Sequence, residues 1–124
     1  MSPIRIKRIY DPVEPGDGYR ILVDRLWPRG MKKEQAALDQ WAKSITPSTE
    51  IRKEFHHDPS RFSEFRQKYL FELENNPESE TFRRQVLEKL HDGPVTLLYG
   101  AKDREVNHAT VLKEWLEREG FSES

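Results

Sequence analysis

Residues 95–109 read VTLLYGAKDREVNHA, a pattern that predicts a buried strand followed closely by a helix. The apolar run from Val95 to Leu98 is typical of a strand that is covered on both faces. Gly100 interrupts the pattern, and apolar side chains then recur at helical spacing up to Gly120, namely Val111, Leu112, Trp115 and Leu116. A strand that hands over to a helix in this way indicates an α/β protein.

Two further strands are expected near the N-terminus. Ile4, Ile6 and Ile9 alternate imperfectly with basic residues, which predicts a strand with one wet face near a sheet edge. After the breaker-rich loop 11–18, residues 19–24 (YRILVD) predict a central strand covered on both faces. The pattern therefore predicts one α/β domain over residues 1–124, with a small, at least partly parallel sheet flanked by helices.

A long helical insertion is expected between residues 33 and 93. Helical spacing of apolar residues suggests a helix over 33–45, and three helix starts follow where a capping residue precedes a proline. These starts are Thr46–Pro47, Asp58–Pro59 and Asn76–Pro77, and Gly93–Pro94 closes the last helix.

The composition excludes several classes of function. The 124 residues include 21 basic and 22 acidic side chains, which nearly cancel to a formal net charge of −1, so any anion binding must come from a local cluster. Because the chain has no cysteine, disulfides, thiolate catalysis and zinc–cysteine sites are excluded. No apolar run approaches the ~18 residues of a membrane helix, so we expect no membrane association and a cytoplasmic location.

The ends of the two central strands are the expected place for a site. If these strands are parallel neighbours, LWPRG (26–30) faces GAKDREVNH (100–108) across a crevice, where α/β sheets usually bind ligands. Asp24 and Asp103 could orient a basic cluster there, which suits a phosphate or carboxylate, and Gly30 and Gly100 permit close approach. The expected cluster is Arg25, Arg29, Lys32, Lys33, Lys102 and Arg104. The alternative is a scaffold in which Trp27 and Pro28 plug the sheet and the arginines pair with local acids.

Asn107 and His108 also have two interpretations. Asn107 suits the N-cap of the last helix, although it lies beside the expected crevice and could also contact a ligand. His108 shares a helical face with Val111 and Leu112, which favours a core-facing, hydrogen-bonded imidazole. Its place beside Lys102 and Asp103 keeps a second hypothesis open, in which His108, oriented by Asp103 or Asn107, acts as a general acid or base.

Other sites find little support in the sequence. His56 and His57 precede Asp58–Pro59, but no partner motif brings further metal ligands to them, so we predict no metal site and interpret Asp58 as a helix cap. No nucleophile elbow and no glycine-rich phosphate motif is present. The sequence specifies neither a cofactor nor an oligomeric state.

Three stretches carry a family resemblance over nearly the whole chain: KRIYDPVEPGDGYRILVDRLWPRGMKKE, HHDPSRFSEFRQKY and LLYGAKDREVNHATVL. They resemble the YeaO-like branch of the domain of unknown function family 488, with VDRLWPRG as the most specific motif. The resemblance implies a small cytoplasmic α/β protein without an established activity. Its motifs fall on Asp24, Arg25, Trp27, Pro28, Arg29, Gly30, Lys102, Asp103, Asn107 and His108.

One departure from the wider family bears on function. Many members carry a cysteine–histidine–arginine signature near the last strand-to-helix junction, whereas this chain reads Val106-Asn107-His108-Ala109. A thiol-dependent role is therefore in doubt. We expect a site for a small anionic ligand, with a nucleic-acid-associated regulatory module or a non-catalytic interaction protein as the alternatives.

Overall fold

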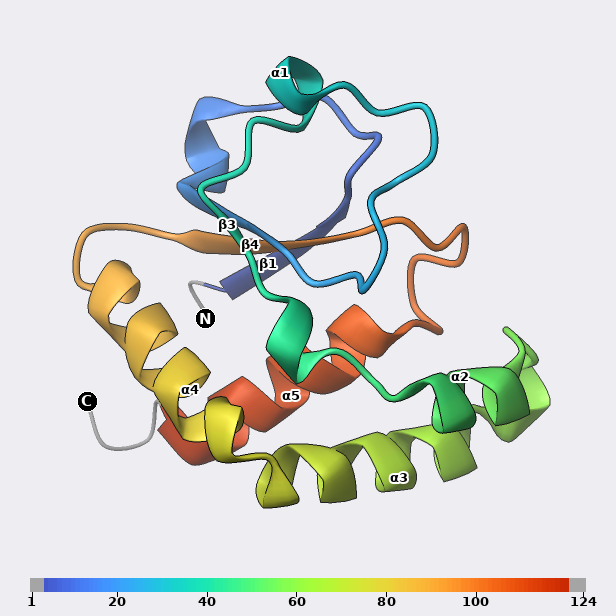
Figure 1. Ribbon diagram of the computed structural model, residues 1–124. Coiled ribbons are helices and arrows are strands. Elements are labelled where there is room, and N and C mark those ends of the chain that lie inside the picture. The colour runs from blue at the N-terminus through green and yellow to red at the C-terminus, as the bar shows by residue number, and fades with distance from the viewer. Residues whose placement is uncertain (1–3, 121–124) are drawn as a thin grey trace.

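The computed structural model describes residues 4–120, and a four-stranded parallel sheet forms its centre (Figure 1). The strands are β1 (Ile4–Arg8), β2 (Tyr19–Leu22), β3 (Gln40–Trp41) and β4 (Val95–Tyr99), in the order β1-β4-β2-β3. All three pairings are parallel. The predicted α/β class is confirmed, and so are the edge position of β1 and the interior position of β2.

Five helices cover the two faces of this sheet unequally (Figure 1). One face carries α2 (Thr49–Phe55), α3 (Phe62–Asn75), α4 (Pro77–Leu90) and α5 (His108–Gly120). Within residues 4–120, the other face carries only the short helix α1 (Lys33–Ala36) and connecting loops. Single 3₁₀ turns lie at Pro15–Asp17, Lys43–Ile45 and Pro59–Arg61. None of the described helices is long and apolar enough to cross a bilayer.

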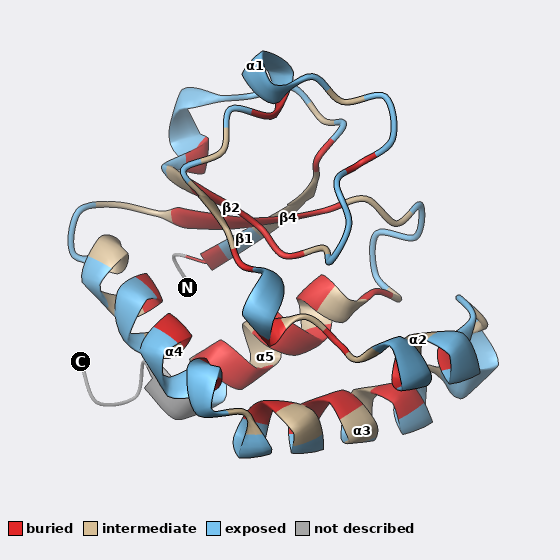
Figure 2. Cartoon of the chain, viewed as in Figure 1, coloured by how far each residue is buried: buried red, intermediate tan, exposed pale blue. Residues whose placement is uncertain are grey.

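The inner strands β2 and β4 are buried between the two layers, whereas the edge strands β1 and β3 are mostly of intermediate exposure (Figure 2). The larger core joins one face of the strands to α2–α5, and its members include Ile21, Val95, Leu97, Leu112 and Trp115. The smaller core lies on the other face and contains Ile9, Leu22, Ala36 and Leu98, against which Met31, Leu38 and Trp41 pack. This arrangement explains the continuous apolar runs in β2 and β4.

Two of the three predicted helix starts are confirmed. The Asp58 side chain accepts the Ser60 N–H at 3.0 Å, and the Asn76 side chain accepts the Glu78 N–H at 2.9 Å. In both cases the next residue is the expected proline at the first helical position. The third start lies two residues later than predicted, because Ser48 caps α2 while the Thr46 hydroxyl donates to the Lys43 carbonyl.

The predicted helix over 33–45 is wrong. Helix α1 ends at Ala36, Ala37 adopts a left-handed conformation (φ 47°), and the chain then pairs with β2 as strand β3. The apolar residues there do have helical spacing, but they serve opposite faces of the sheet. Trp41 packs against the smaller core, whereas the next residue, Ala42, belongs to the larger one.

Candidate functional site

The carboxyl ends of β2 and β4 meet, as the sequence predicted for parallel neighbours. Asp24 follows β2, and its Oδ2 accepts the Gly100 N–H at 2.8 Å from the residue that follows β4. A Cβ on Gly100 would lie 2.9 Å from this oxygen, so only glycine allows the approach. One hydrogen bond therefore fixes the two strand-to-loop junctions relative to each other.

His108 begins α5 and lies against the same junction. Its Nε2 is 2.8 Å from the Val23 carbonyl oxygen and 3.0 Å from Oδ1 of Asp24. One ring N–H cannot align with both acceptors, and Oδ1 of Asp24 is a buried oxygen without a hydrogen bond from the described residues. The imidazole is thus fixed by the end of β2, with 17% of its side chain exposed.

The structure corrects the expected orientation of His108 by Asp103 or Asn107. The Asp103 carboxylate instead accepts the N–H groups of Val106 and Glu105, each at 2.9 Å, and these bonds lower the pKa of Asp103. Asn107 is buried and caps α5 by accepting the Thr110 N–H at 3.0 Å. Both residues therefore shape the loop before α5, and the N-cap interpretation of Asn107 is confirmed.

A pocket of about 220 Å³ opens at this sheet edge. Two arginines line it, Arg25 from the loop after β2 and Arg52 from α2, together with Asp24 and His108. Nε of Arg52 is buried and donates to no described residue. The other lining residues are Leu26, Thr46, Pro47 and Ala101. The two guanidinium groups and the one carboxylate sum to one net positive charge.

Other residues of the VDRLWPRG motif lie away from the pocket. The Trp27 indole donates to the Met31 carbonyl at 2.7 Å and packs edge-on against Trp41, with ring centroids 5.3 Å apart. The Arg29 side chain is exposed, and its carbonyl accepts the Tyr10 hydroxyl. Gly30 has a φ of 75°, and a Cβ there would meet nothing within 4 Å. The positive φ explains the glycine by the turn, and the close approach of a ligand to Gly30 stays a prediction.

The expected basic cluster does not assemble as one group. Arg104 forms a bidentate pair with Asp11 at 2.8 and 2.9 Å, and Lys102 is exposed on the loop after β4. Lys32 and Lys33 lie at the start of α1, beside the opposite face of the sheet (Figure 1). Arg25 is the member of that cluster that lines the pocket.

Sequence reasoning missed Arg52 and Thr46. Arg52 follows the buried Ile51 in a short amphipathic helix and looks like an ordinary surface arginine. Thr46 resembled a helix cap. Arg52 and Thr46 reach Asp24 and His108 because α2 and the residues before it pack beside the sheet edge. The residues around them in the sequence do not predict this packing.

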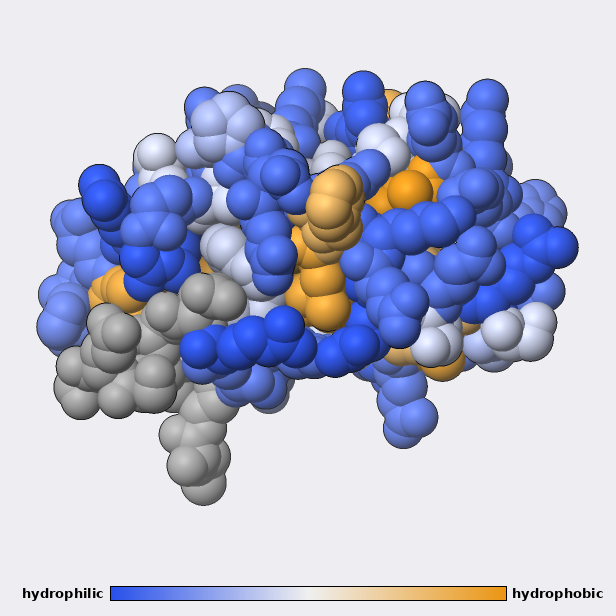
Figure 3. All heavy atoms as spheres, turned by 90° about the horizontal axis from the view of Figure 1, so that it is seen from below, coloured by the Kyte–Doolittle hydropathy of each residue, from blue (hydrophilic) through white to orange (hydrophobic). Residues whose placement is uncertain are grey.

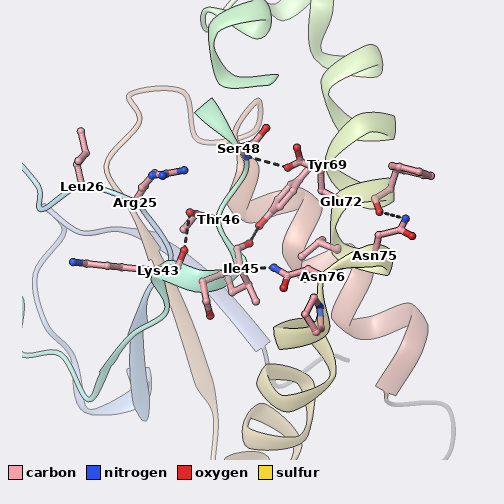
Figure 4. A pocket seen from close by; sticks show the side chains of 14 residues that line it. Arg25, Leu26, Lys43, Ile45, Thr46, Ser48, Tyr69, Glu72, Asn75 and Asn76 are labelled. Atoms are coloured by element: carbon pink, nitrogen blue, oxygen red, sulfur yellow. Dashed lines mark hydrogen bonds between the residues drawn. The ribbon is translucent and has the colours of Figure 1, made fainter. Parts of the chain in front are cut away.

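An open groove of about 940 Å³ adjoins the pocket and shares Arg25, Leu26 and Thr46 with it. Figure 4 shows its walls, with Lys43, Ile45 and Ser48 on one side and Tyr69, Glu72 and Asn75 of α3 on the other. The face that α3 helps to form is mostly hydrophilic but carries an apolar strip near its middle (Figure 3). Among the described residues, no group of three or more His, Asp or Glu side chains could hold a metal ion.

Comparisons with known proteins agree with the resemblance seen in the sequence. Residues 3–124 match the family model described as the inactive DUF488-N3 subclade. The uncharacterised protein YeaO of Escherichia coli K12 is 52% identical over 113 residues, covering 91% of this chain and 96% of YeaO. The uncharacterised protein Rv3073c of Mycobacterium tuberculosis H37Rv is 34% identical over 113 residues, covering 91% and 92%.

No solved structure is significantly similar to this chain. The family assignment therefore rests on sequence, and it is strong because the model spans almost the whole chain and the similarity to YeaO is high. The chain belongs to the inactive DUF488-N3 subclade of the domain of unknown function family 488, in its YeaO-like branch.

Proposed function

We propose that this protein binds a small anion, a carboxylate or phosphate group, in the pocket lined by Asp24, Arg25, Arg52 and His108. The observation that carries this proposal is the buried Nε of Arg52, which has no hydrogen-bond acceptor within the described part of the chain. A buried donor without an acceptor costs about 1–3 kcal/mol, and an anionic oxygen would supply the acceptor.

The surroundings of Arg52 support an anion rather than a neutral ligand. Arg25 adds a second guanidinium, and the pocket keeps a net positive charge even with the Asp24 carboxylate included. Oδ2 of Asp24 accepts the Gly100 N–H, and Oδ1 lies 3.0 Å from Nε2 of His108. His108 also places the N-terminus of α5, a helix of 13 residues, beside the pocket.

Binding without turnover is the function that these residues support best. The chain has no cysteine to act as a nucleophile, and the subclade to which it belongs is described as inactive. Asp103 was the expected partner of His108 in proton transfer. Its carboxylate instead accepts hydrogen bonds from two backbone N–H groups of its own loop. That this binding takes place in the cytoplasm stays a prediction, which cell fractionation would test.

The test is a titration of the protein with inorganic phosphate and with acetate, at constant pH and ionic strength, followed by amide chemical shifts. Arg52→Gln should weaken binding at least tenfold, about 1.4 kcal/mol, because it removes a charge-assisted donor. The matched control is Arg84→Gln, since Arg84 lies on α4 and its side chain is 76% exposed. Affinity should change less than about twofold there.

Two results would contradict the proposal. The first is saturable binding that Arg52→Gln and Arg84→Gln weaken equally. The second is binding of a short oligonucleotide, falling steeply with added salt, without binding of phosphate or acetate. That second result would favour the nucleic-acid-associated alternative.

A further inference from the structure

We infer that the ligand is an amphipathic anion, with its charged head in the pocket and an uncharged apolar body in the adjoining groove. This inference rests on the proposed function and adds the class of ligand. The pocket holds about 220 Å³, which is below the roughly 300–1,000 Å³ of most small-molecule sites. The groove holds about 940 Å³, so pocket and groove together suit a molecule much larger than an inorganic ion.

The two spaces share part of their lining. Arg25, Leu26 and Thr46 line both of them, so a ligand held by its head at Arg25 and Arg52 can extend from the pocket into the groove. In Figure 4, Arg25 and Leu26 lie on one side of the segment that carries Thr46 and Ser48, and Tyr69 and Glu72 lie on the other side. Leu26 is 71% exposed although it is a large apolar residue next to a charged one.

Several uncharged polar groups of the groove walls already have partners within the protein. The Tyr69 hydroxyl donates to the Ile45 carbonyl at 2.6 Å, and the Asn76 amide donates to the Ser44 carbonyl at 2.7 Å. The Ser48 N–H donates to Glu72 Oε1 at 3.0 Å. These groups are therefore not free to bind a ligand.

The groove also presents exposed apolar surface to a ligand. Phe71 on α3 is 68% exposed, and with Leu26 it supplies two large apolar side chains that the fold itself does not bury. Covering such surface is favourable by about 25 cal/mol per Å², so an apolar body would gain affinity from it. The groove therefore favours a hydrocarbon or aromatic body over a polar one.

The charges of the groove argue for a single anionic head. Arg25 and Lys43 lie on one side, and Glu72 lies on the other (Figure 4). A second anionic group at the far end of the ligand would meet the Glu72 carboxylate and lose its hydration among apolar side chains. A ligand with one charged end fits this distribution.

The test compares ligands that share a head and differ in body, by calorimetric titration below the micelle concentration. Octanoate should bind at least tenfold more tightly than acetate, and octyl phosphate more tightly than phosphate. One fully buried methylene is worth roughly fourfold, and an open groove buries only part of each. Octanedioate, with a second carboxylate at the far end, should bind at least fivefold more weakly than octanoate.

Variants separate the groove from the pocket. Phe71→Ala should reduce the preference for octanoate at least threefold while the affinity for acetate stays the same, because Phe71 lines the groove and not the pocket. The matched control is Val13→Ala, because Val13 is an exposed apolar residue of another loop. It should leave both affinities unchanged.

Each negative result has its own meaning. Acetate or phosphate binding without a preference for the longer ligands would overturn this inference and leave the proposed function standing. Absence of binding by any of these anions would overturn both. A preference for octanoate that Val13→Ala reduces as much as Phe71→Ala does would show that the apolar body binds elsewhere.

Discussion

At the scale of single residues, the contact between Asp24 and Gly100 holds the site together. Gly100→Ala would place a Cβ 2.9 Å from Oδ2 of Asp24 and disturb the hydrogen bond that joins the ends of β2 and β4. We expect a loss of about 1–3 kcal/mol in the free energy of unfolding, measured by urea denaturation. This loss is expected because the added methyl group would crowd the Asp24 carboxylate between the ends of β2 and β4.

Gly16→Ala is the control for that substitution. A Cβ at Gly16 would meet only the flexible end of the Arg5 side chain, at 3.0 Å. Its cost should stay within about 0.5 kcal/mol. Equal destabilisation by the two substitutions would show that the junction is not a special point of the fold.

A second residue-scale prediction concerns the buried pair of Asp17 and Arg20, whose side-chain atoms lie 2.6 Å apart. Burial raises the pKa of Asp17, but hydrogen bonds from the Glu14 N–H, Lys7 and Arg20 outweigh it, so the pKa lies below the usual 3.8. The ionised form is thus favoured by folding. Its contribution to stability is fully present above about pH 5 and is lost as the pH falls through the lowered pKa.

Asp17→Asn tests this linkage. It should cost about 3 kcal/mol at pH 7, because Arg20 and Lys7 lose a buried charged partner. Stability curves between pH 7 and pH 2 should then fall less steeply for the variant than for the wild type. Parallel curves would contradict the assigned role of Asp17.

At the scale of elements, the cap of α5 is the feature that places His108. Asn107→Ala removes the acceptor for the Thr110 N–H and the donor to the Asp103 carbonyl, at 3.0 and 2.9 Å. A loss of about 1–2 kcal/mol is expected, and Asn107→Ser should recover part of it because serine also caps helices. Thermal unfolding of both variants measures this, and equal melting temperatures would contradict the capping role.

Element prediction succeeded where the signal was local. The apolar run of β4, the proline-headed starts at Pro59 and Pro77, and the Asn107 cap can all be read within a few residues. It failed at residues 33–45, because the side chains of Trp41 and Ala42 serve opposite faces of the sheet. That division depends on the pairing of β3 with β2, which spacing along the chain does not reveal.

At the scale of the whole molecule, the sheet separates a large core from a small one. Leu97 belongs to the larger core and Leu98 to the smaller, and both are fully buried. Each substitution to alanine should therefore cost about 2–5 kcal/mol in chemical denaturation. A cost below about 1 kcal/mol for Leu98→Ala would contradict the burial of this residue in the smaller core. It would mean that α1 and its loops leave this face of the sheet open to water.

The site is a property of this whole arrangement. Parallel strands end at the same edge of a sheet, and ligands usually bind there. This rule was enough to predict three of the pocket residues from the sequence, namely Asp24, Arg25 and His108. Arg52 and the groove beside α3 come from the packing of the insertion between β3 and β4, and they required the structure. The basic cluster predicted from the sequence was too large. Arg104, for example, pairs with Asp11 instead.

Anion binding in the pocket is tested most directly by NMR. The ring signals of the four histidines are recorded during addition of phosphate or acetate, at constant pH and ionic strength. His108 lies in the pocket, whereas His56, His57 and His91 are exposed elsewhere and act as internal controls. Anion binding in the pocket should produce a saturable shift of the His108 signals alone, and Arg52→Gln should abolish that shift. Equal, unsaturated shifts of all four rings, or no shift at His108, would contradict an anion site at this edge of the sheet.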